Sequence, residues 1–183
     1  MKHLQNLNMK QPAHVSQLFI MVGAPGSGKS TFARKRFPNA RYISRDEIRF
    51  SVLKPDEDYF SKEKLTWKMF IDAIQKAVND DMCDEIVIDA SHLNFPSRRK
   101  LTNALDDALI NPWEIYYIYM NTPYDVCCQR NDLRTGRANI PHNVILDMWN
   151  KMTIPKFSEH ADIKGVWIIG ESKDDLSNER SSF

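Results

Sequence analysis

The chain has 183 residues, of which 42% are hydrophobic, so it is long enough for one domain with a substantial core. Its 25 lysines and arginines nearly balance 24 acidic residues, so no global field attracts a polyanion and any anion site must be local. The 3 cysteines lack a metal-ligand spacing, which indicates free thiols in a reducing cytoplasm, and no apolar run is long enough to span a bilayer.

Apolar runs that alternate with helical patterns predict an α/β fold with a five-stranded, mostly parallel sheet and right-handed crossovers. Strands are expected at about 17–22, 41–43, 85–89, 114–120 and 165–169. Helices are expected up to Phe37, from Ser44, over about 62–80, from Asn94, from Thr122 to near Gly136, and from Pro141. One domain at 17–170 would then lie between polar tails at 1–16 and 171–183.

A glycine-rich segment joins the first strand to its helix and fits G-x-x-x-x-G-K-[ST], the phosphate-binding P-loop. Its members are Gly23, Ala24, Pro25, Gly26, Ser27, Gly28, Lys29, Ser30 and Thr31. Glycines let the backbone curl until its N–H groups face a phosphate, and the helix N-terminus adds a favourable dipole. Lys29 is therefore expected to reach the β- and γ-phosphates of a nucleotide and Ser30 to ligate Mg²⁺.

A polar segment at 44–49 follows the second strand. Ser44 and Glu47 have the spacing of a capping box, which explains Glu47 as part of a helix cap. Asp46 has two interpretations: a carboxylate that accepts the proton of an attacking hydroxyl, or an acid that stabilises the first helical turn. Arg49, one turn later, either faces the same cleft and holds the acceptor or is a solvated partner.

Asp89 ends the third strand, the position of the second acidic motif of P-loop enzymes, where a carboxylate orients Mg²⁺, its water or the acceptor. The alternative is an aspartate that caps the following turn. Asn94 and Pro96 are expected to begin the next helix. His92 has no evident metal partners and is interpreted as a surface or loop histidine. Because ligands bind at the carboxyl ends of parallel strands, the motifs at 23–31, 44–49 and 89–94 should converge.

Arg130, Arg134 and Arg137 are four and three residues apart, so they point the same way if the helix persists. They precede the loop at 136–141, where small P-loop kinases keep a mobile lid with arginines that neutralise the transferring phosphoryl group. A solvated basic face is the other interpretation.

Other basic and aromatic residues are expected to be structural. The basic clusters at 34–36 and 98–100 are interpreted as solvated surface. Phe50, Tyr59, Phe60 and Trp67 lie near the presumed acceptor side, where stacking on bases is conceivable, but core packing is the expectation.

Four segments together resemble the kinase domain of phage 5′-polynucleotide kinases over about residues 18–152. They are G-A-P-G-S-G-K-S-T, S-R-D-E-I-R, V-I-D-A-S-H-L-N-F-P-S-R-R and R-N-D-L-R-T-G-R-A-N-I-P. Those enzymes transfer the γ-phosphoryl of ATP to a 5′-hydroxyl end of DNA or RNA. The resemblance implies an adenylate-kinase-like P-loop fold, ATP and Mg²⁺ as cofactors, a function in nucleic acid repair, and the cytoplasm of a host cell if the chain is phage-encoded.

Carried over by position, the resemblance makes Lys29 and Ser30 ligands of phosphate and Mg²⁺, Asp46 the general base and Arg49 a residue of the acceptor side. Arg134 becomes the lid arginine, with Arg137 as the competing assignment and Arg130 as a further nucleotide contact. The family has an acidic residue in the segment V-I-D-A-S-H-L-N-F-P-S-R-R, and that residue aligns with Asp89 or with the neighbouring Ala90. We choose Asp89 as the ligand of metal and substrate.

The sequence also leaves alternatives open. No D-x-D-x-T phosphatase motif occurs, so 3′-phosphatase activity is not predicted. The rival functions are a kinase of a small-molecule hydroxyl, such as a nucleoside, sugar or antibiotic, and a P-loop ATPase that is not a kinase. DNA and RNA are equally compatible, and a homo-oligomer is possible.

Overall fold

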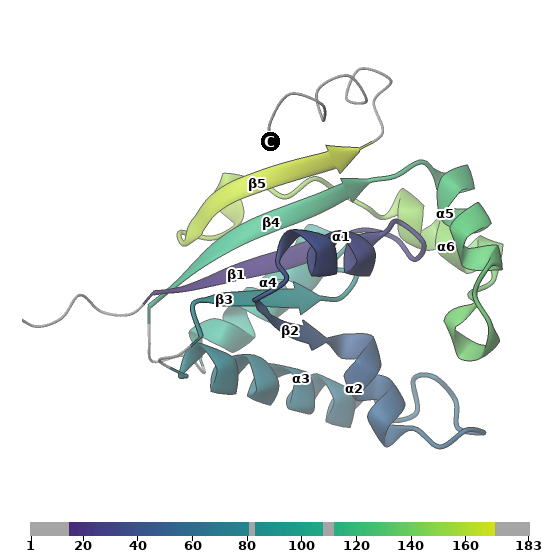
Figure 1. The fold of residues 1–183 in the computed structure, drawn as a ribbon, viewed down its shortest axis with the longest axis horizontal. Coiled ribbons are helices and arrows are strands. Elements are labelled where there is room, and N and C mark those ends of the chain that lie inside the picture. The colour runs from purple at the N-terminus through teal and green to yellow at the C-terminus, as the bar shows by residue number, and fades with distance from the viewer. Residues whose placement is uncertain (1–14, 81–82, 108–111, 171–183) are drawn as a thin grey trace, which may run out of the picture.

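A computed structural model describes residues 15–80, 83–107 and 112–170, and its centre is a parallel sheet of five strands in the order β2-β3-β1-β4-β5 (Figure 1). The strands are β1 (Ser16–Val22), β2 (Arg41–Ser44), β3 (Glu85–Asp89), β4 (Trp113–Asn121) and β5 (Ile163–Gly170). The helices are α1 (Lys29–Arg36), α2 (Arg45–Val52), α3 (Glu63–Val78), α4 (Phe95–Asp106), α5 (Tyr124–Asp132) and α6 (His142–Asn150), with short 3-10 turns η1 (Gly136–Ala138) and η2 (Phe157–Glu159).

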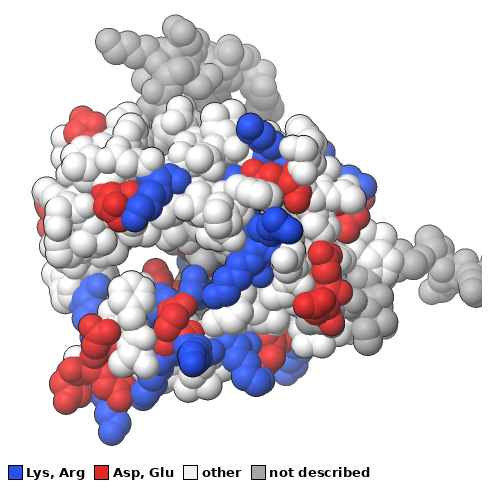
Figure 2. Space-filling model, turned by 180° about the vertical axis from the view of Figure 1, so that it is seen from behind, with Lys and Arg blue, Asp and Glu red and all other residues white. Residues whose placement is uncertain are grey.

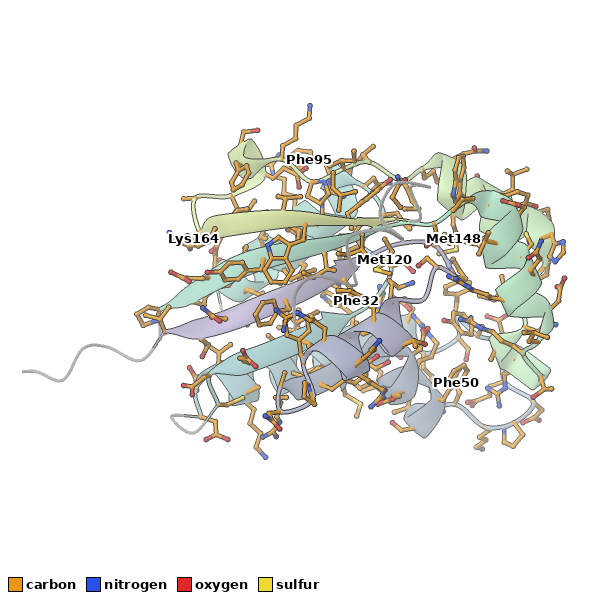
Figure 3. The ribbon with its side chains drawn as sticks, turned by 45° about the horizontal axis from the view of Figure 1, so that its top comes forward. Phe32, Phe50, Phe95, Met120, Met148 and Lys164 are labelled. Carbon is orange, nitrogen blue, oxygen red and sulfur yellow. The ribbon has the colours of Figure 1, made fainter. Side chains whose placement is uncertain are left out.

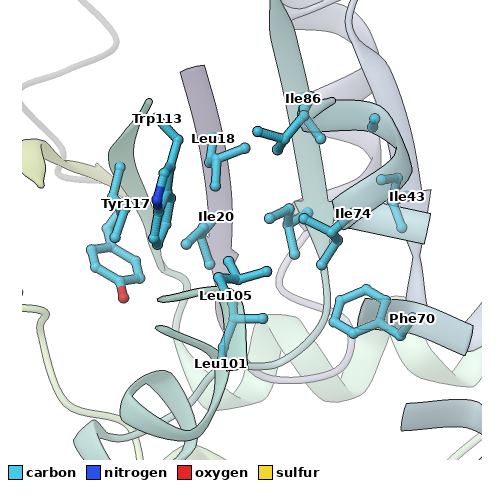
Figure 4. Packing of buried hydrophobic residues seen from close by; sticks show 14 of the residues in the cluster. Leu18, Ile20, Ile43, Phe70, Ile74, Ile86, Leu101, Leu105, Trp113 and Tyr117 are labelled. Atoms are coloured by element: carbon cyan, nitrogen blue, oxygen red, sulfur yellow. The ribbon is translucent and has the colours of Figure 1, made fainter. Parts of the chain in front are cut away.

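The larger part of the core lies between one face of the sheet and helices α3 and α4 (Figure 4). Leu18 and Ile20 of β1 point to this face and pack with Ile74 of α3 and Leu101 of α4, all fully buried. Alternate residues of a strand point to opposite faces, so an uninterrupted apolar strand must be covered on both sides.

Helix α1 covers the opposite face of the sheet, where Phe19 and Met21 of β1 are buried. The rings of Phe19 and Phe37 stack with their centroids 4.1 Å apart. A third small cluster joins Ala24 of the glycine-rich loop to Cys127 of α5 and Ile145 of α6. Three packed layers therefore fix the carboxyl ends of β1, β2 and β3 relative to one another.

The expected fold class is confirmed: the class is α/β, every strand pair in the described residues is parallel, and the carboxyl ends of β1, β2 and β3 share one edge. Ser16 belongs to β1 and not to the preceding tail. The tails at 1–14 and 171–183 lie outside the described residues. Across the parts of the chain that the structure describes, no helix has the length and apolarity that a membrane crossing requires.

One helix boundary was predicted wrongly. The pattern predicted a helix from Thr122 to near Gly136, but α5 ends at Asp132. Asn131 is fully buried, and its side chain donates to the Ile140 carbonyl at 2.8 Å and accepts from the Ile140 N–H at 2.9 Å. This pair of bonds ties the returning loop to the helix end, and Gly136 turns that loop with a φ of 59°.

Candidate functional site

The glycine-rich loop at 23–28 curls tightly at the carboxyl end of β1 because two glycines adopt left-handed backbone angles. Gly26 has a φ of 79° and Gly28 a φ of 90°, a region that residues with a Cβ rarely enter. A Cβ placed on Gly26 would lie 2.2 Å from the Cys127 carbonyl oxygen, so α5 packs directly on the loop. The Thr122 hydroxyl donates to the Ser27 carbonyl at 2.9 Å and anchors the loop to the end of β4.

Lys29 begins α1 and folds its side chain back under the loop. Its Nζ donates to the carbonyl oxygens of Gly23 and Ala24, at 3.0 Å each. Burial lowers the pKa of Lys29, the negative charges of Asp89 and Asp46 oppose that shift, and the positive charge of Arg134 reinforces it. The charges of carboxylates on β3 and α2 and of a guanidinium on the α5–α6 connection thus all affect the pKa of Lys29.

Ser30 and Asp89 form the part of the site that suits a divalent cation. The Ser30 hydroxyl donates to Asp89 Oδ2 at 2.6 Å, and the Tyr42 hydroxyl donates to the same oxygen. Asp89 is buried at the end of β3. A hydroxyl and a carboxylate are hard oxygen ligands, and a Mg²⁺ ion takes one or two of them while substrate phosphates and water complete its shell. The donor set therefore fits Mg²⁺.

Asp46 lies in the first turn of α2, which Ser44 caps by accepting the Glu47 N–H at 3.3 Å, as its spacing predicts. Asp46 Oδ1 accepts from Arg49 Nη1 at 2.6 Å and from the Tyr59 hydroxyl at 2.6 Å. Arg49 is only 4% exposed and also donates to Glu63 Oε2 at 2.8 Å. A buried arginine and a tyrosine thus hold one oxygen of a carboxylate whose side chain is 64% exposed.

The three basic residues expected to share one helical face are instead spread over the connection from α5 to α6, because α5 ends before two of them. Arg130 remains on α5, and its Nη1 lies 3.5 Å from the place where a Cβ on Gly28 would sit. Arg134 follows α5, and its positive charge lowers the pKa of Lys29. Arg137, in η1, donates to the Lys54 carbonyl at 2.7 Å and so crosses to the segment between α2 and α3.

These segments surround a hollow in the surface. Seen from behind, the molecule is hollowed on the side of α2, α5 and α6, and basic and acidic side chains gather beside the hollow (Figure 2). The contact between Arg137 and Lys54 bridges the lid to the α2–α3 segment. The arrangement places an anion cradle on one side and an exposed carboxylate, Asp46, on the other.

Arg98 differs from the expectation of solvated surface, because it is buried. Arg98 is 1% exposed and donates to both carboxylate oxygens of Glu159, at 2.7 Å each, and to the carbonyls of His92 and Thr153. Arg98 thus links α4 to the loop after β3 and to η2, and it is not part of the solvated surface. The contiguous R-R-K pattern at 98–100 does not indicate that Arg98 is buried, because its partner Glu159 is 61 residues away in the chain.

His92 is a loop residue, as expected, but it is 5% exposed rather than at the surface. Burial, together with the positive charges of Arg45, Arg98 and Lys29, lowers its pKa to about 3. The imidazole is therefore neutral at physiological pH. Its φ of 41° is left-handed, so the loop bends sharply there.

The sequence predicted no site role for Tyr42 or Asn131, and no hydrogen bond from the Tyr59 hydroxyl. Each acts on a residue far along the chain or across a loop, as Tyr42 does on Asp89. Asn131 carried a weak signal, since a buried asparagine at a helix end usually satisfies a returning backbone. Thr31 lies in the first turn of α1, directly after Lys29 and Ser30, and its contact with a nucleotide stays a prediction.

Comparison with known proteins supplies the family. A family model described as an AAA domain matches residues 18–155, most of the chain. One similar solved structure is a chain of the Pnkp1/Rnl/Hen1 RNA repair complex, with a TM-score of 0.63 and 24% identity, covering 79% of this chain and 45% of that one. A fungal RNA kinase has a TM-score of 0.61 and 16% identity, covering 91% of this chain and 42% of its own.

A sugar kinase from Janibacter sp. HTCC2649 is also similar, with a TM-score of 0.57 and 14% identity, and the match covers 91% of this chain and 92% of that one. The chain spans less than half the length of the RNA repair chain and of the fungal RNA kinase. At these identities the structures show a shared fold. The P-loop family and the kinase-like fold expected from the sequence are confirmed, and the acceptor is not decided by them.

Proposed function

We propose that this chain, which belongs to the AAA domain family (AAA_33), is an ATP-dependent kinase that phosphorylates the 5′-hydroxyl end of a polynucleotide. One observation carries the proposal. The Ser30 hydroxyl, at the end of the phosphate-binding loop, donates to Asp89 at 2.6 Å, and Asp46 follows Ser44, the register partner of Asp89 on the neighbouring strand, so a phosphate loop, a metal-binding carboxylate and an exposed carboxylate lie at one edge of the sheet. That is the set of groups that phosphoryl transfer to an alcohol requires.

On the donor side, Lys29 sits beneath a loop whose backbone would cradle the β- and γ-phosphates of ATP. Ser30 and Asp89 would hold Mg²⁺, which when bound supplies charge neutralisation at the phosphate oxygens. Arg130 and Arg134 come to the loop from the lid side. This geometry supports Arg134 over Arg137 as the lid arginine, because Arg137 donates to the α2–α3 segment.

On the acceptor side, Asp46 would take the proton of the attacking hydroxyl as a general base. Arg49 and Tyr59 both donate to Oδ1, so we assign Oδ2 to the incoming alcohol. Arg49 is largely buried beneath Asp46, which makes it a positioning residue in this arrangement. Its direct contact with the acceptor stays a prediction.

Two lines of support favour a polynucleotide acceptor: the resemblance in the segments at 44–49 and 130–141, and the fold shared with an RNA repair chain and an RNA kinase. The fold shared with a sugar kinase keeps a small-molecule acceptor as the second candidate.

Labelled ATP separates these candidates. The protein is incubated with γ-labelled ATP and Mg²⁺ beside a 5′-hydroxyl oligonucleotide of DNA or RNA, the same oligonucleotide with a 5′-phosphate, and a panel of nucleosides and sugars. We expect label on the 5′-hydroxyl oligonucleotide alone. Transfer only to the panel contradicts the polynucleotide acceptor, and release of labelled phosphate without any labelled acceptor contradicts the kinase.

A further inference from the structure

An aromatic cluster lies beside the candidate base. Phe50 is in the last turns of α2, and Tyr59 and Phe60 are in the segment before α3. The ring centroids of Tyr59 and Phe60 are 4.8 Å apart at an angle of 83°, and those of Phe50 and Tyr59 are 6.1 Å apart. We call these three residues the aromatic platform.

Phe50 and Phe60 are exposed, which corrects the expectation of core packing for these two rings, whereas Tyr59 is half-buried and Trp67 packs against the core as expected. The Phe60 side chain is 65% exposed and Phe50 is 39% exposed, whereas Phe70 on the neighbouring α3 is fully buried. Apolar ring surface that stays in water contributes no burial energy, so folding gains little from these two rings. Their open surface is available to a ligand instead.

One ring of the platform contacts the candidate base, and two arginine side chains lie beside its rings. The Tyr59 hydroxyl donates to Asp46 Oδ1 at 2.6 Å, so one ring of the platform is bonded to the candidate base. The Arg49 guanidinium lies 4.2 Å from the Tyr59 centroid. From the lid, the Arg137 guanidinium lies 5.9 Å from the Phe50 centroid. Aromatic faces between guanidinium groups suit a chain of bases joined by phosphates.

We infer that the aromatic platform stacks the unpaired base at the 5′ end of the acceptor strand, an inference that rests on the proposed function. A hydroxyl held at Asp46 places the adjoining base near Tyr59, which contacts the same carboxylate, and near the Phe50 and Phe60 rings that pack against Tyr59. Stacking tolerates any base because every base has a π face. A base that is paired at a blunt duplex end must first leave its stack, so single strands and overhanging 5′ ends are the preferred acceptors.

The test compares steady-state phosphorylation of two 5′-hydroxyl oligonucleotides, one with a normal 5′ nucleotide and one with an abasic residue there. Phe60→Ala and Phe50→Ala are each expected to raise KM for the normal strand roughly five- to hundredfold, the range that loss of one stacked base gives. Neither variant should alter KM for the abasic strand or for ATP. Phe60→Trp keeps a π face and should retain the KM of the wild type.

Two exposed phenylalanines away from the platform serve as matched controls. Phe95 is 41% exposed and Phe157 is 62% exposed, close to the values of Phe50 and Phe60. Figure 3 shows Phe50 toward the end of the molecule that carries α5 and α6 and Phe95 away from it. Phe95→Ala and Phe157→Ala should leave every KM unchanged.

The outcomes distinguish the inference from the proposed function. If the wild type phosphorylates both oligonucleotides with equal KM, or if Phe60→Ala and Phe50→Ala behave like their controls, the platform does not stack the base, while the kinase assignment stands. If the wild type labels no oligonucleotide but labels a sugar or nucleoside, the polynucleotide function itself is wrong and the platform inference falls with it.

Discussion

The two sides of the cleft are built in different ways. The proposed phosphate side is one continuous stretch at 23–31 whose backbone N–H groups would do most of the binding, and its partner Asp89 is buried. The acceptor side collects Asp46 from α2, Tyr59 from the following segment and Arg137 from the lid, and its groups are side chains at or near the surface. A backbone cradle recognises what all nucleoside triphosphates share, whereas exposed side chains set the acceptor and vary freely on one scaffold.

The two sides together form the proposed site, so we expect substitutions of the groups that would act on phosphate or acceptor to lower turnover in a folded protein, whereas substitutions in the buried framework around the site lower stability. Four variants test this expectation, and each has a control variant.

The largest effect is expected from Arg98→Met, because it leaves the buried Glu159 carboxylate, 9% exposed, without its cation. Breaking a buried pair from one side costs about 3–5 kcal/mol of the free energy of unfolding. Urea unfolding followed by circular dichroism measures the loss. Arg99→Met, at the exposed neighbour, should change the free energy of unfolding by less than about 0.5 kcal/mol. An equal loss in both variants would show that the ion pair of Arg98 with Glu159 does not stabilise the fold.

Lys29→Met is next, since it removes a positive charge from the phosphate cradle. We expect kcat for labelled phosphate transfer to fall roughly 10²–10³-fold, the scale for one preorganised group that stabilises transition-state charge. The protein should remain folded, because a desolvated ammonium is replaced by an apolar chain of similar length. Lys35→Met on the exposed side of α1 is the control. Activity near that of the control would remove Lys29 from the catalytic set.

Asp46→Asn keeps the size of the side chain and its hydrogen-bond acceptor but removes the base. Turnover is expected to fall roughly a hundredfold or more while ATP binding, measured by calorimetry, is unchanged. Glu47→Gln alters the neighbouring carboxylate, which pairs with Arg34 at 2.7 Å, and should leave turnover intact. Near-normal activity of Asp46→Asn would show that Asp46 only stabilises the N-terminal turn of α2 and is not the base.

The smallest effect concerns His92 and pH. Its pKa is about 3 in the folded protein and near the ordinary 6.5 when unfolded, so below pH 6.5 the unfolded chain binds the extra proton. Its contribution to stability is therefore complete above pH 6.5 and is lost by up to about 1.4 kcal/mol per pH unit as pH falls toward 3. His92→Asn, which tolerates a left-handed φ, should flatten the pH dependence of unfolding relative to wild type.

The exposed His142, on α6, provides the control for that measurement. His142→Asn should follow the wild-type pH profile between pH 4 and 7 more closely than His92→Asn does. Indistinguishable profiles for the two variants would contradict a buried, neutral His92.

The sequence predicted the strands, the sheet class and the phosphate side because their signals are local. Five apolar runs, the G-x-x-x-x-G-K-[ST] segment and the Ser44 and Asn94 caps are each decided by neighbours within a few residues. The prediction failed where a partner is distant. The end of α5 depends on Asn131 meeting Ile140 across a loop, and the burial of Arg98 depends on Glu159.

By itself, then, the sequence determined an α/β domain with a P-loop and nominated Asp46, Asp89 and the lid arginines. Only the tertiary structure decided that Tyr59 holds Asp46, that Arg137 reaches the α2–α3 segment, and that Phe50 and Phe60 stay exposed. The physical reason is range. Periodicity and backbone angles act between neighbours in the chain, whereas burial and side-chain pairing depend on segments that come together only when the sheet and its layers pack.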